Sequence, residues 1–268
     1  MRTLSVSRAW EETRDILARD GRLYVAVALA LMVLPAVISG LVNPKGMGNT
    51  GIALWMSLVS LVASLVMLAG QLSIIRLALG PSVTVGGAIA HGLRRLPIYF
   101  VAAIIIIVAL LALAIPFGLI AQALGVPMNR GQNVPASPTL LVLLLLYVAV
   151  AIFIGVRLIL AAPVASAERV GPISLLKRAW LLSNGNFWRL FGFILLFFIA
   201  AIVILFSVGA ASGVAVALVL GPPNPLSVSA LILALIQALL SAAFTAFLSV
   251  MLTRFYVQLS GYSAQEAR

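Results

Sequence analysis

The sequence predicts an all-α integral membrane protein with six transmembrane helices. Of its 268 residues, 63% are hydrophobic and 9% are charged, whereas soluble domains have about 45–50% apolar and about 25% charged residues. The apolar residues form long continuous runs, and a helix needs roughly 20 of them to cross a bilayer. A transmembrane barrel would show alternation in segments of roughly ten residues instead. We therefore expect residues 1–268 to form a single membrane domain.

The predicted elements follow from where the apolar runs begin and end. Residues 1–21 place Val6 and Trp10 on one helical face and charged side chains on the others, which predicts an N-terminal amphipathic helix on the membrane surface. Pro35 and Pro116 lie inside apolar runs and are expected to kink them. The six predicted spans cover residues of about 22–42, 52–79, 97–124, 139–163, 187–219 and 226–258.

The charges are distributed unevenly between the two sides of the predicted bundle. The net charge is +11, yet the first 24 residues hold five basic and four acidic side chains that nearly cancel. The connections on one side contain only Lys45 and Arg130, and the other basic residues lie on the side of the two termini. The positive-inside rule then predicts cytoplasmic termini in the cell (inner or plasma) membrane. The excess of basic residues also predicts contact with anionic membrane lipids, and we do not expect nucleic acid as a partner.

An internal repeat is the second organising feature of the sequence. A shift of 170 residues matches Arg-Ala-Trp at residues 8–10 with Arg-Ala-Trp at residues 178–180, and a weaker middle copy lies at residues 84–97. We therefore predict three pseudo-repeated helical hairpins of roughly 85 residues, each preceded by a cytoplasmic amphipathic helix. Each even-numbered span also carries one arginine shortly before its cytoplasmic end: Arg76, Arg157 and Arg254.

The most distinctive stretch joins the fourth and fifth predicted spans. It runs Arg157-Leu158-x-Leu160-Ala161-Ala162-Pro163, then Glu168-Arg169-x-Gly171-Pro172, then Lys177-Arg178-Ala179-Trp180-Leu181-Leu182-x-Asn184-Gly185-x-Phe187-Trp188-Arg189-Leu190-Phe191-Gly192. This pattern resembles the signature of the glycerophosphoryl diester phosphodiesterase membrane-domain family. In some members of that family the membrane domain precedes a soluble phosphodiesterase barrel, and many members lack the barrel. The resemblance implies a membrane domain alone, because only ten residues follow the last predicted span.

Within this stretch the sequence predicts a structural elbow between the fourth span and the following surface helix. Glu168 is close enough in sequence to Arg169 and Arg157 to form an ion pair with either one. A gate or a proton-linked carboxylate is the alternative role for Glu168. The predicted elbow residues are Pro163, Glu168, Arg169, Pro172 and Trp180.

The sequence predicts no catalytic site, no metal site and no cofactor. Cysteine is absent, and His91 is the only histidine, with Asp20 and Glu168 as the nearest acids along the chain. A metal-assisted phosphodiesterase needs several carboxylates and usually histidine. The sequence also lacks a G-x-S-x-G motif and a phosphate-binding G-x-x-x-x-G-K motif. We therefore expect His91 to be an ordinary polar residue on a surface helix.

The arginines of the even-numbered spans are the leading functional candidates. A charge inside a span is costly unless it reaches the interface, pairs with another group or meets lipid phosphate. The simpler interpretation is that these arginines anchor the topology. The alternative hypothesis is that they meet in one pocket for a lipid phosphate, because guanidinium forks suit phosphate oxygens. That headgroup site consists of Arg76, Arg157 and Arg254, helped by Lys177, Arg178 and Arg189.

Together these observations predict a non-enzymatic, multi-pass membrane module. It is expected to bind anionic lipid or a membrane-protein partner at its cytoplasmic face. One alternative is a passive pore or a transporter of lipids or small molecules, since uncharged polar residues such as Gln71 and Gln237 lie within spans. A second alternative is the membrane part of a glycerophosphodiester phosphodiesterase system.

Overall fold

The computed structural model describes residues 4–42, 50–80, 83–126, 137–222, 224 and 227–261. Within these ranges the secondary structure is helical and contains no strand. Six helices are long and apolar enough to cross a membrane, which confirms the all-helical fold class and the number of candidate spans. Lys45, Arg130 and Arg268, on which part of the predicted topology rests, lie outside the described residues.

The helices agree closely with three of the predicted spans, and differ at the others in ways that are described below. The elements are α1 (Val6–Ala28), a π-helical turn η1 (Leu29–Val33), α2 (Leu34–Val42), α3 (Thr50–Leu79), α4 (Val85–Ala123), α5 (Pro138–Leu158), α6 (Ala161–Ala167), α7 (Pro172–Ser183), α8 (Phe187–Leu220) and α9 (Val228–Ser260).

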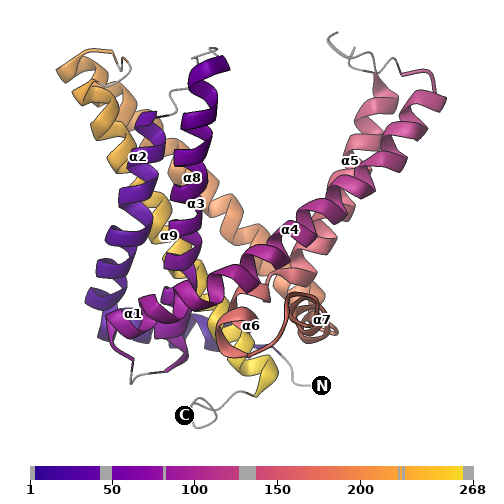
Figure 1. Cartoon of the computed structure of the whole chain (residues 1–268), viewed down its shortest axis with the longest axis horizontal. Helices are drawn as coiled ribbons and strands as arrows, with labels where there is room; N and C mark the ends of the chain where they lie inside the picture. Colours follow the sequence, from indigo (N-terminus) through magenta and orange to yellow (C-terminus); the bar gives the residue numbers. More distant parts are fainter. Residues whose placement is uncertain are drawn as a thin grey trace.

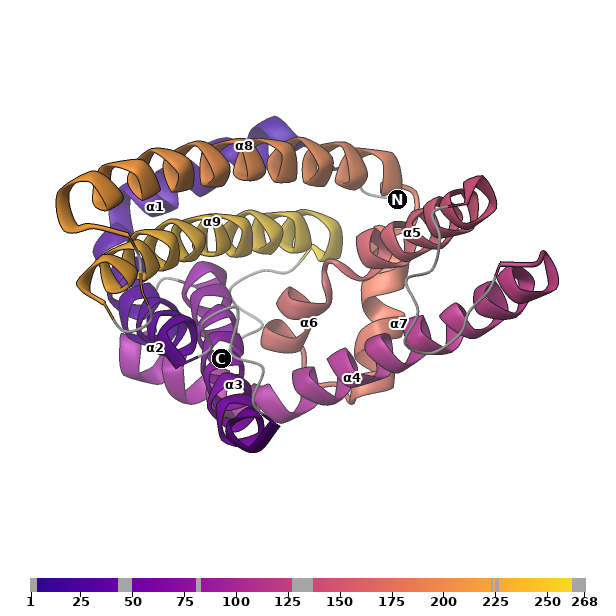
Figure 2. The ribbon, with the colours of Figure 1, turned by 90° about the horizontal axis from the view of Figure 1, so that it is seen from above.

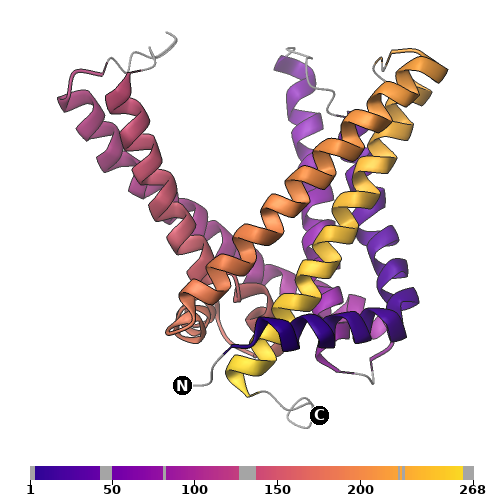
Figure 3. The ribbon, with the colours of Figure 1, turned by 180° about the vertical axis from the view of Figure 1, so that it is seen from behind.

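The long helices form two groups that diverge from a common base. Helices α2, α3, α8 and α9 lie together, whereas α4 and α5 form an arm that leans away from them, so that the molecule has the outline of a V (Figures 1 and 3). We call the end of the molecule where α1 begins and α9 ends the base. The short helices α6 and α7 also lie at the base, and Figure 2 shows α6 between α9 and α4, and α7 running from α5 to α4.

The N-terminal amphipathic helix and the first span were predicted as separate elements, but they form one helical run from Val6 to Val42. Its first part lies across the base, and its later part stands upright beside α9 (Figure 3). The run contains the π-helical turn, in which the Leu34 N–H donates to the Leu29 carbonyl. Pro35 is the second residue after this turn and lacks the N–H that a regular helix would direct at the Leu31 carbonyl. The expected distortion at Pro35 is therefore a π-helical turn.

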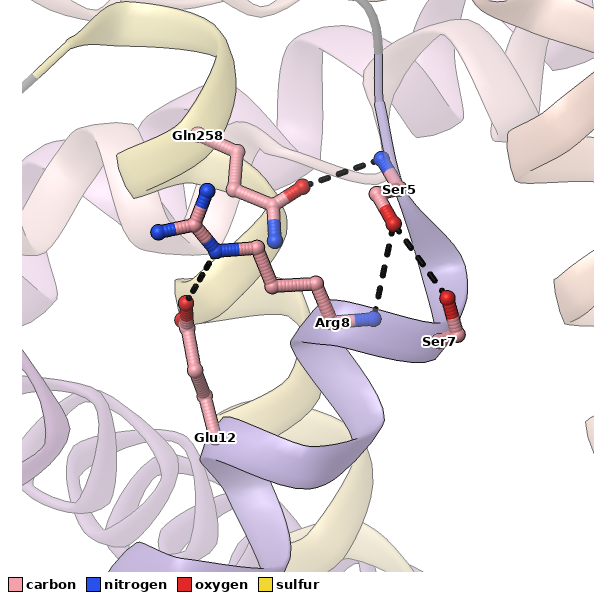
Figure 4. Close-up of polar contacts among 5 residues, drawn as sticks. All are labelled: Ser5, Ser7, Arg8, Glu12 and Gln258. Carbon is pink, nitrogen blue, oxygen red and sulfur yellow. Dashed lines mark hydrogen bonds and ion pairs between the residues drawn. The ribbon is translucent and has the colours of Figure 1, made fainter.

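The start of the described chain is fastened to the end of α9. The Ser5 N–H donates to Oε1 of Gln258 at 3.1 Å, and the Ser5 hydroxyl caps α1 by accepting from the Arg8 N–H (Figure 4). On the exposed face, Nε of Arg8 forms an i, i+4 ion pair with Glu12 at 3.1 Å (Figure 4). Both ends of the helical domain therefore lie at the base.

Helix α4 is a single helix of 39 residues, although the sequence predicted a surface helix over residues 84–97 and a separate span from 97 to 124. Thr84 caps its beginning, because its hydroxyl accepts from the Gly87 N–H at 3.2 Å. The helix runs along the base and then outward into the arm (Figure 1), passing through both Pro97 and Pro116. Continuous helical geometry therefore joins two segments that were predicted to be distinct.

The helix of the fourth predicted span is interrupted before Pro163. Helix α5 stops at Leu158, and after a short turn the chain forms α6, which contains Pro163. Proline has no N–H to donate to the carbonyl four residues earlier, here Ile159, and its ring clashes with that carbonyl. The helix therefore breaks before Pro163, and Arg157 lies in the last turn of α5 instead of well inside a longer helix.

The base holds most of the core, and the arm holds little of it. Residues 161–166 of α6 are all buried, and α6 contacts α3, α4, α7 and α9. Around it lie fully buried large side chains, including Leu160, Leu175, Phe255 and Tyr256. Of the most apolar 18-residue stretch, 39% is buried in α3 but only 6% in α4 and in α5. The arm therefore presents most of its apolar surface outward.

Candidate functional site

A cluster of basic side chains lies at the base, where α4 begins and where α6 leads into α7. His91, Arg94, Arg95 and Ile98 follow one another at i, i+3, i+4 and i+7, so they share one face of α4. With Arg169, Val170 and Gly171 they line a cavity of about 470 Å³. We call this cavity the basic cleft.

The polar contacts of α6 hold His91 at the wall of the basic cleft. Nε2 of His91 lies 2.8 Å from the Ser166 carbonyl oxygen, and because a carbonyl only accepts, Nε2 is the nitrogen that donates. The Ser166 hydroxyl donates in turn to the Leu72 carbonyl of α3 at 3.3 Å. His91 is thus a positioned side chain that joins α4 to α6, and the sequence alone predicted only an ordinary surface position for it.

The electrostatic character of the basic cleft is strongly positive. Arg76, Arg95 and Arg169 all lie close enough to His91 to act on it as like charges. None of the residues that line the cleft is acidic. Arg94 and Arg169 are exposed, and Arg95 is half-buried. Like charges that lie close together repel one another, so the arrangement of these arginines favours an anion between them.

The close approach of α4 to α3 fixes where the basic cleft lies. Gly92 is buried between His91 and the two arginines. A Cβ atom at this position would collide with the Ser73 hydroxyl and would lie 2.6 Å from the Ala69 carbonyl oxygen of α3. Glycine is therefore required for the two helices to pack at this distance.

Glu168 of the predicted elbow forms a different ion pair from the one expected. Oε1 of Glu168 accepts from Nε of Arg178 at 3.1 Å and from the Tyr256 hydroxyl at 2.9 Å. Pro172 is the first residue of α7, and α7 folds back so that Arg178 reaches Glu168. The pairing of Glu168 with Arg169 or Arg157 was therefore wrong, because Arg169 faces the basic cleft and Arg157 has other partners.

Arg157 is surrounded by aromatic rings. Its guanidinium carbon lies 5.3 Å from the ring centre of Phe153, 5.2 Å from that of Trp180 and 5.6 Å from that of Phe187. Its Nη1 donates to Oδ1 of Asn184 at 3.0 Å. Trp180 thus belongs to the surroundings of Arg157 as well as to the elbow.

The other predicted headgroup residues are dispersed over the base. Nη2 of Arg254 donates to the Ala78 carbonyl of α3, and Nη1 of Arg189 donates to the Leu4 carbonyl at 2.9 Å. Lys177 is exposed on α7. Arg76 lies near His91, and Arg157 lies among aromatic rings between α5, α7 and α8. The structure therefore gives Arg76, Arg157 and Arg254 three different environments, and their role in binding lipid stays a prediction.

Sequence reasoning did not group His91, Arg94, Arg95 and Arg169. The signal was present in part, because the i, i+3, i+4 spacing of His91, Arg94 and Arg95 indicates a shared helix face with no acid on the same segment. The addition of Arg169 depends on how α6 folds between α3 and α4. That contact between distant segments has no signature in the sequence.

No group of three or more His, Asp or Glu side chains is placed to hold a metal ion in the parts of the chain that the structure describes.

A family model described as "Domain of unknown function (DUF7847)" matches residues 4–259. No curated protein and no solved structure matches the chain. The relation to the glycerophosphoryl diester phosphodiesterase membrane-domain family stays a prediction. Because the match extends over nearly the whole sequence, the chain belongs to the family described as a domain of unknown function (DUF7847).

Proposed function

We propose that this protein is a non-enzymatic, multi-pass module of the cell (plasma or inner) membrane that binds anionic phospholipid through the basic cleft. The observation that carries the proposal is the meeting of His91, Arg94, Arg95 and Arg169 around one cavity without an acidic residue in its lining. Planar guanidinium groups bind phosphate oxygens through paired, charge-assisted hydrogen bonds. A phosphate group bound in the basic cleft neutralises the positive charges of the arginines that lie close together around it.

The location of the basic cleft supports a membrane lipid as the source of this phosphate. Ile98 lines the cleft on the side from which α4 continues into its apolar, outward-facing stretch. A lipid headgroup can therefore occupy the cleft while its acyl chains follow the exposed surface of the arm. The excess of basic residues on this side also fits the cytoplasmic leaflet, whose anionic lipids attract clustered arginines.

The decisive variant is Arg94→Gln combined with Arg169→Gln. Each charge-assisted hydrogen bond contributes about 1.5–3 kcal/mol, and about 1.4 kcal/mol is tenfold in affinity. We therefore expect the double variant to bind anionic phospholipid at least about tenfold more weakly than the wild type. The measurement is native mass spectrometry of the purified full chain, titrated in detergent with phosphatidylglycerol and with the zwitterionic phosphatidylcholine.

The matched control removes two exposed arginines from α1, Arg14→Gln with Arg22→Gln, and so changes the net charge by the same amount. This control should bind phosphatidylglycerol as the wild type does. Equal loss in both double variants would mean that overall charge, and not the basic cleft, attracts the lipid, and the proposal would fail. A parallel titration with inorganic phosphate separates a lipid site from a site for the free anion. Solute flux through liposomes that contain the protein would contradict a module without transport activity.

The proposed orientation makes a separate prediction. With both termini in the cytoplasm, a fluorescent protein fused to the C-terminus should be bright, because the usual green fluorescent protein folds poorly after export in an unfolded state. Alkaline phosphatase fused at the same point should be inactive, since it needs the oxidising periplasm for its disulfides. The opposite pair of results would invert the topology and place the basic cleft at the outer leaflet.

A further inference from the structure

The second feature that points to a ligand is the pocket beside Arg157, lined by α5 and the start of α8. It has a volume of about 580 Å³, within the range of about 300–1,000 Å³ that ligand pockets occupy. Helix α5 contributes Ala149, Ile152 and Phe153 together with Arg157, and the first turns of α8 contribute Phe187, Trp188 and Phe191. We call this space the Arg157 pocket.

Among the described residues, the groups in contact with the Arg157 guanidinium are neutral. Three aromatic rings and the Asn184 amide oxygen surround the guanidinium, and its Nε is buried without a hydrogen-bond partner. Among the described residues, no acidic side chain forms an ion pair with Arg157, and Glu168 is held by Arg178. A cation beside the hydrocarbon of a bilayer is unfavourable unless it meets a counter-charge. The structure therefore leaves a place for an anion from outside the chain.

The remainder of the Arg157 pocket is apolar and elongated. Along α5 the lining extends from Arg157 back to Ala149, which is about 12 Å at about 1.5 Å per residue. This direction leads from the base into the membrane-spanning part of the helix. One end of the pocket is thus cationic, and the rest suits hydrocarbon. A ligand with an anionic head and an alkyl chain matches both ends.

We infer that the Arg157 pocket binds an anionic amphiphile, with its carboxylate or phosphate on the Arg157 guanidinium and its hydrocarbon chain between α5 and α8. This site uses other residues than the basic cleft, so it does not rest on the proposed function. Trp180 and Trp188 lie at the head end, where they report on occupancy.

The test uses quenching of tryptophan fluorescence by brominated amphiphiles in the purified full chain. Trp10→Phe and Trp55→Phe remove two exposed tryptophans and leave Trp180 and Trp188 as the only reporters. The probes are a brominated fatty acid, the corresponding lysophosphatidic acid and the uncharged brominated alcohol. We expect saturable quenching by at least one of the two acids, and affinity for the alcohol that is lower by roughly tenfold. The tighter acid identifies the head group.

Two further variants separate the head from the chain. Arg157→Gln should reduce the affinity for the acid roughly tenfold and leave the weak affinity for the alcohol unchanged. Ala149→Phe keeps the charge, fills the apolar end of the pocket and adds no tryptophan, so it should abolish quenching by both probes. When Arg94→Gln and Arg169→Gln are added to the protein that carries Trp10→Phe and Trp55→Phe, the probes should quench its fluorescence to the same extent as without them. Equal affinity for acid and alcohol, or an acid affinity that survives Arg157→Gln, would overturn the inference while leaving the basic cleft untouched.

Discussion

Replacing Gly92 with alanine should lower the free energy of unfolding by about 1–3 kcal/mol, the usual cost of overpacking. The added methyl group would meet the Ser73 hydroxyl and the Ala69 carbonyl oxygen of α3. Ser73 cannot easily turn away, because it is fully buried and its hydroxyl donates to the same Ala69 carbonyl at 2.7 Å. Relief therefore requires α4 to move away from α3. Thermal and denaturant-induced unfolding in detergent would measure the loss.

The matched control is Gly118→Ala in the same helix, where an added Cβ would meet nothing within 4 Å. Its stability should equal that of the wild type or exceed it slightly, since alanine favours a helix by up to about 1 kcal/mol over glycine. Because Gly92 lies between His91 and Arg94, Gly92→Ala should also weaken lipid binding at the basic cleft. Equal stability of the two variants would show that α3 and α4 do not pack as closely as described.

Replacing Glu168 with alanine should cost about 1–3 kcal/mol, because a nearly fully buried hydroxyl, that of Tyr256, loses this acceptor. Arg178 contributes less to the loss, since 45% of its side chain is exposed and water can replace the carboxylate. Tyr256→Phe alone should cost about 1 kcal/mol. In the double variant the two losses should not add, and a double-mutant cycle from unfolding curves gives the coupling.

Glu12→Ala is the control for a carboxylate in an exposed ion pair. It separates Glu12 from Arg8, whose side chain is 74% exposed, and should cost less than about 1 kcal/mol. If Glu168→Ala costs no more than this control, the elbow is held by the packing of α6 and α7 and not by Glu168. Strict additivity of Glu168→Ala and Tyr256→Phe would likewise exclude the bond between them.

The sequence predicted the spans well where hydrophobic length alone determines them. Helices α3, α8 and α9 begin and end within about two residues of the predicted limits, as is usual for such boundaries. The predictions failed at prolines, because a proline can either lie inside a helix or follow a break in it. Pro97 was expected to separate a surface helix from a span and instead lies inside α4, whereas Pro163 was expected to end a span and instead follows a break in it.

The arrangement of the side chains at the base was much less predictable. In a membrane helix nearly every face is apolar, so periodicity gives little information about which face meets a neighbour. The contact of His91 with the Ser166 carbonyl depends on two segments 75 residues apart. The three repeated arginines illustrate the same limit, because an equal position along three helices does not imply a common pocket. The predicted repeat and amphipathic surface helices stay predictions.

The fastening of the N-terminal segment has a consequence for how the protein is made. Leu4 is held by Asn186 and Arg189 at the start of α8, and Ser5 by Gln258 at the end of α9. Chains are synthesised and inserted from the N-terminus at about 5–20 residues per second. The first residues therefore emerge long before any of these partners exists.

The N-terminal segment must consequently be among the last parts of this domain to reach its final position. The beginning of α1 can take its final position only after α9 has entered the membrane, and Thr13, which donates to the sulfur of Met251, waits for the same helix. A nascent chain arrested before α9 should leave its N-terminus open to proteolysis, and completion of the chain should protect it. Protection of the segment before α1 would thus report that α9 has been inserted.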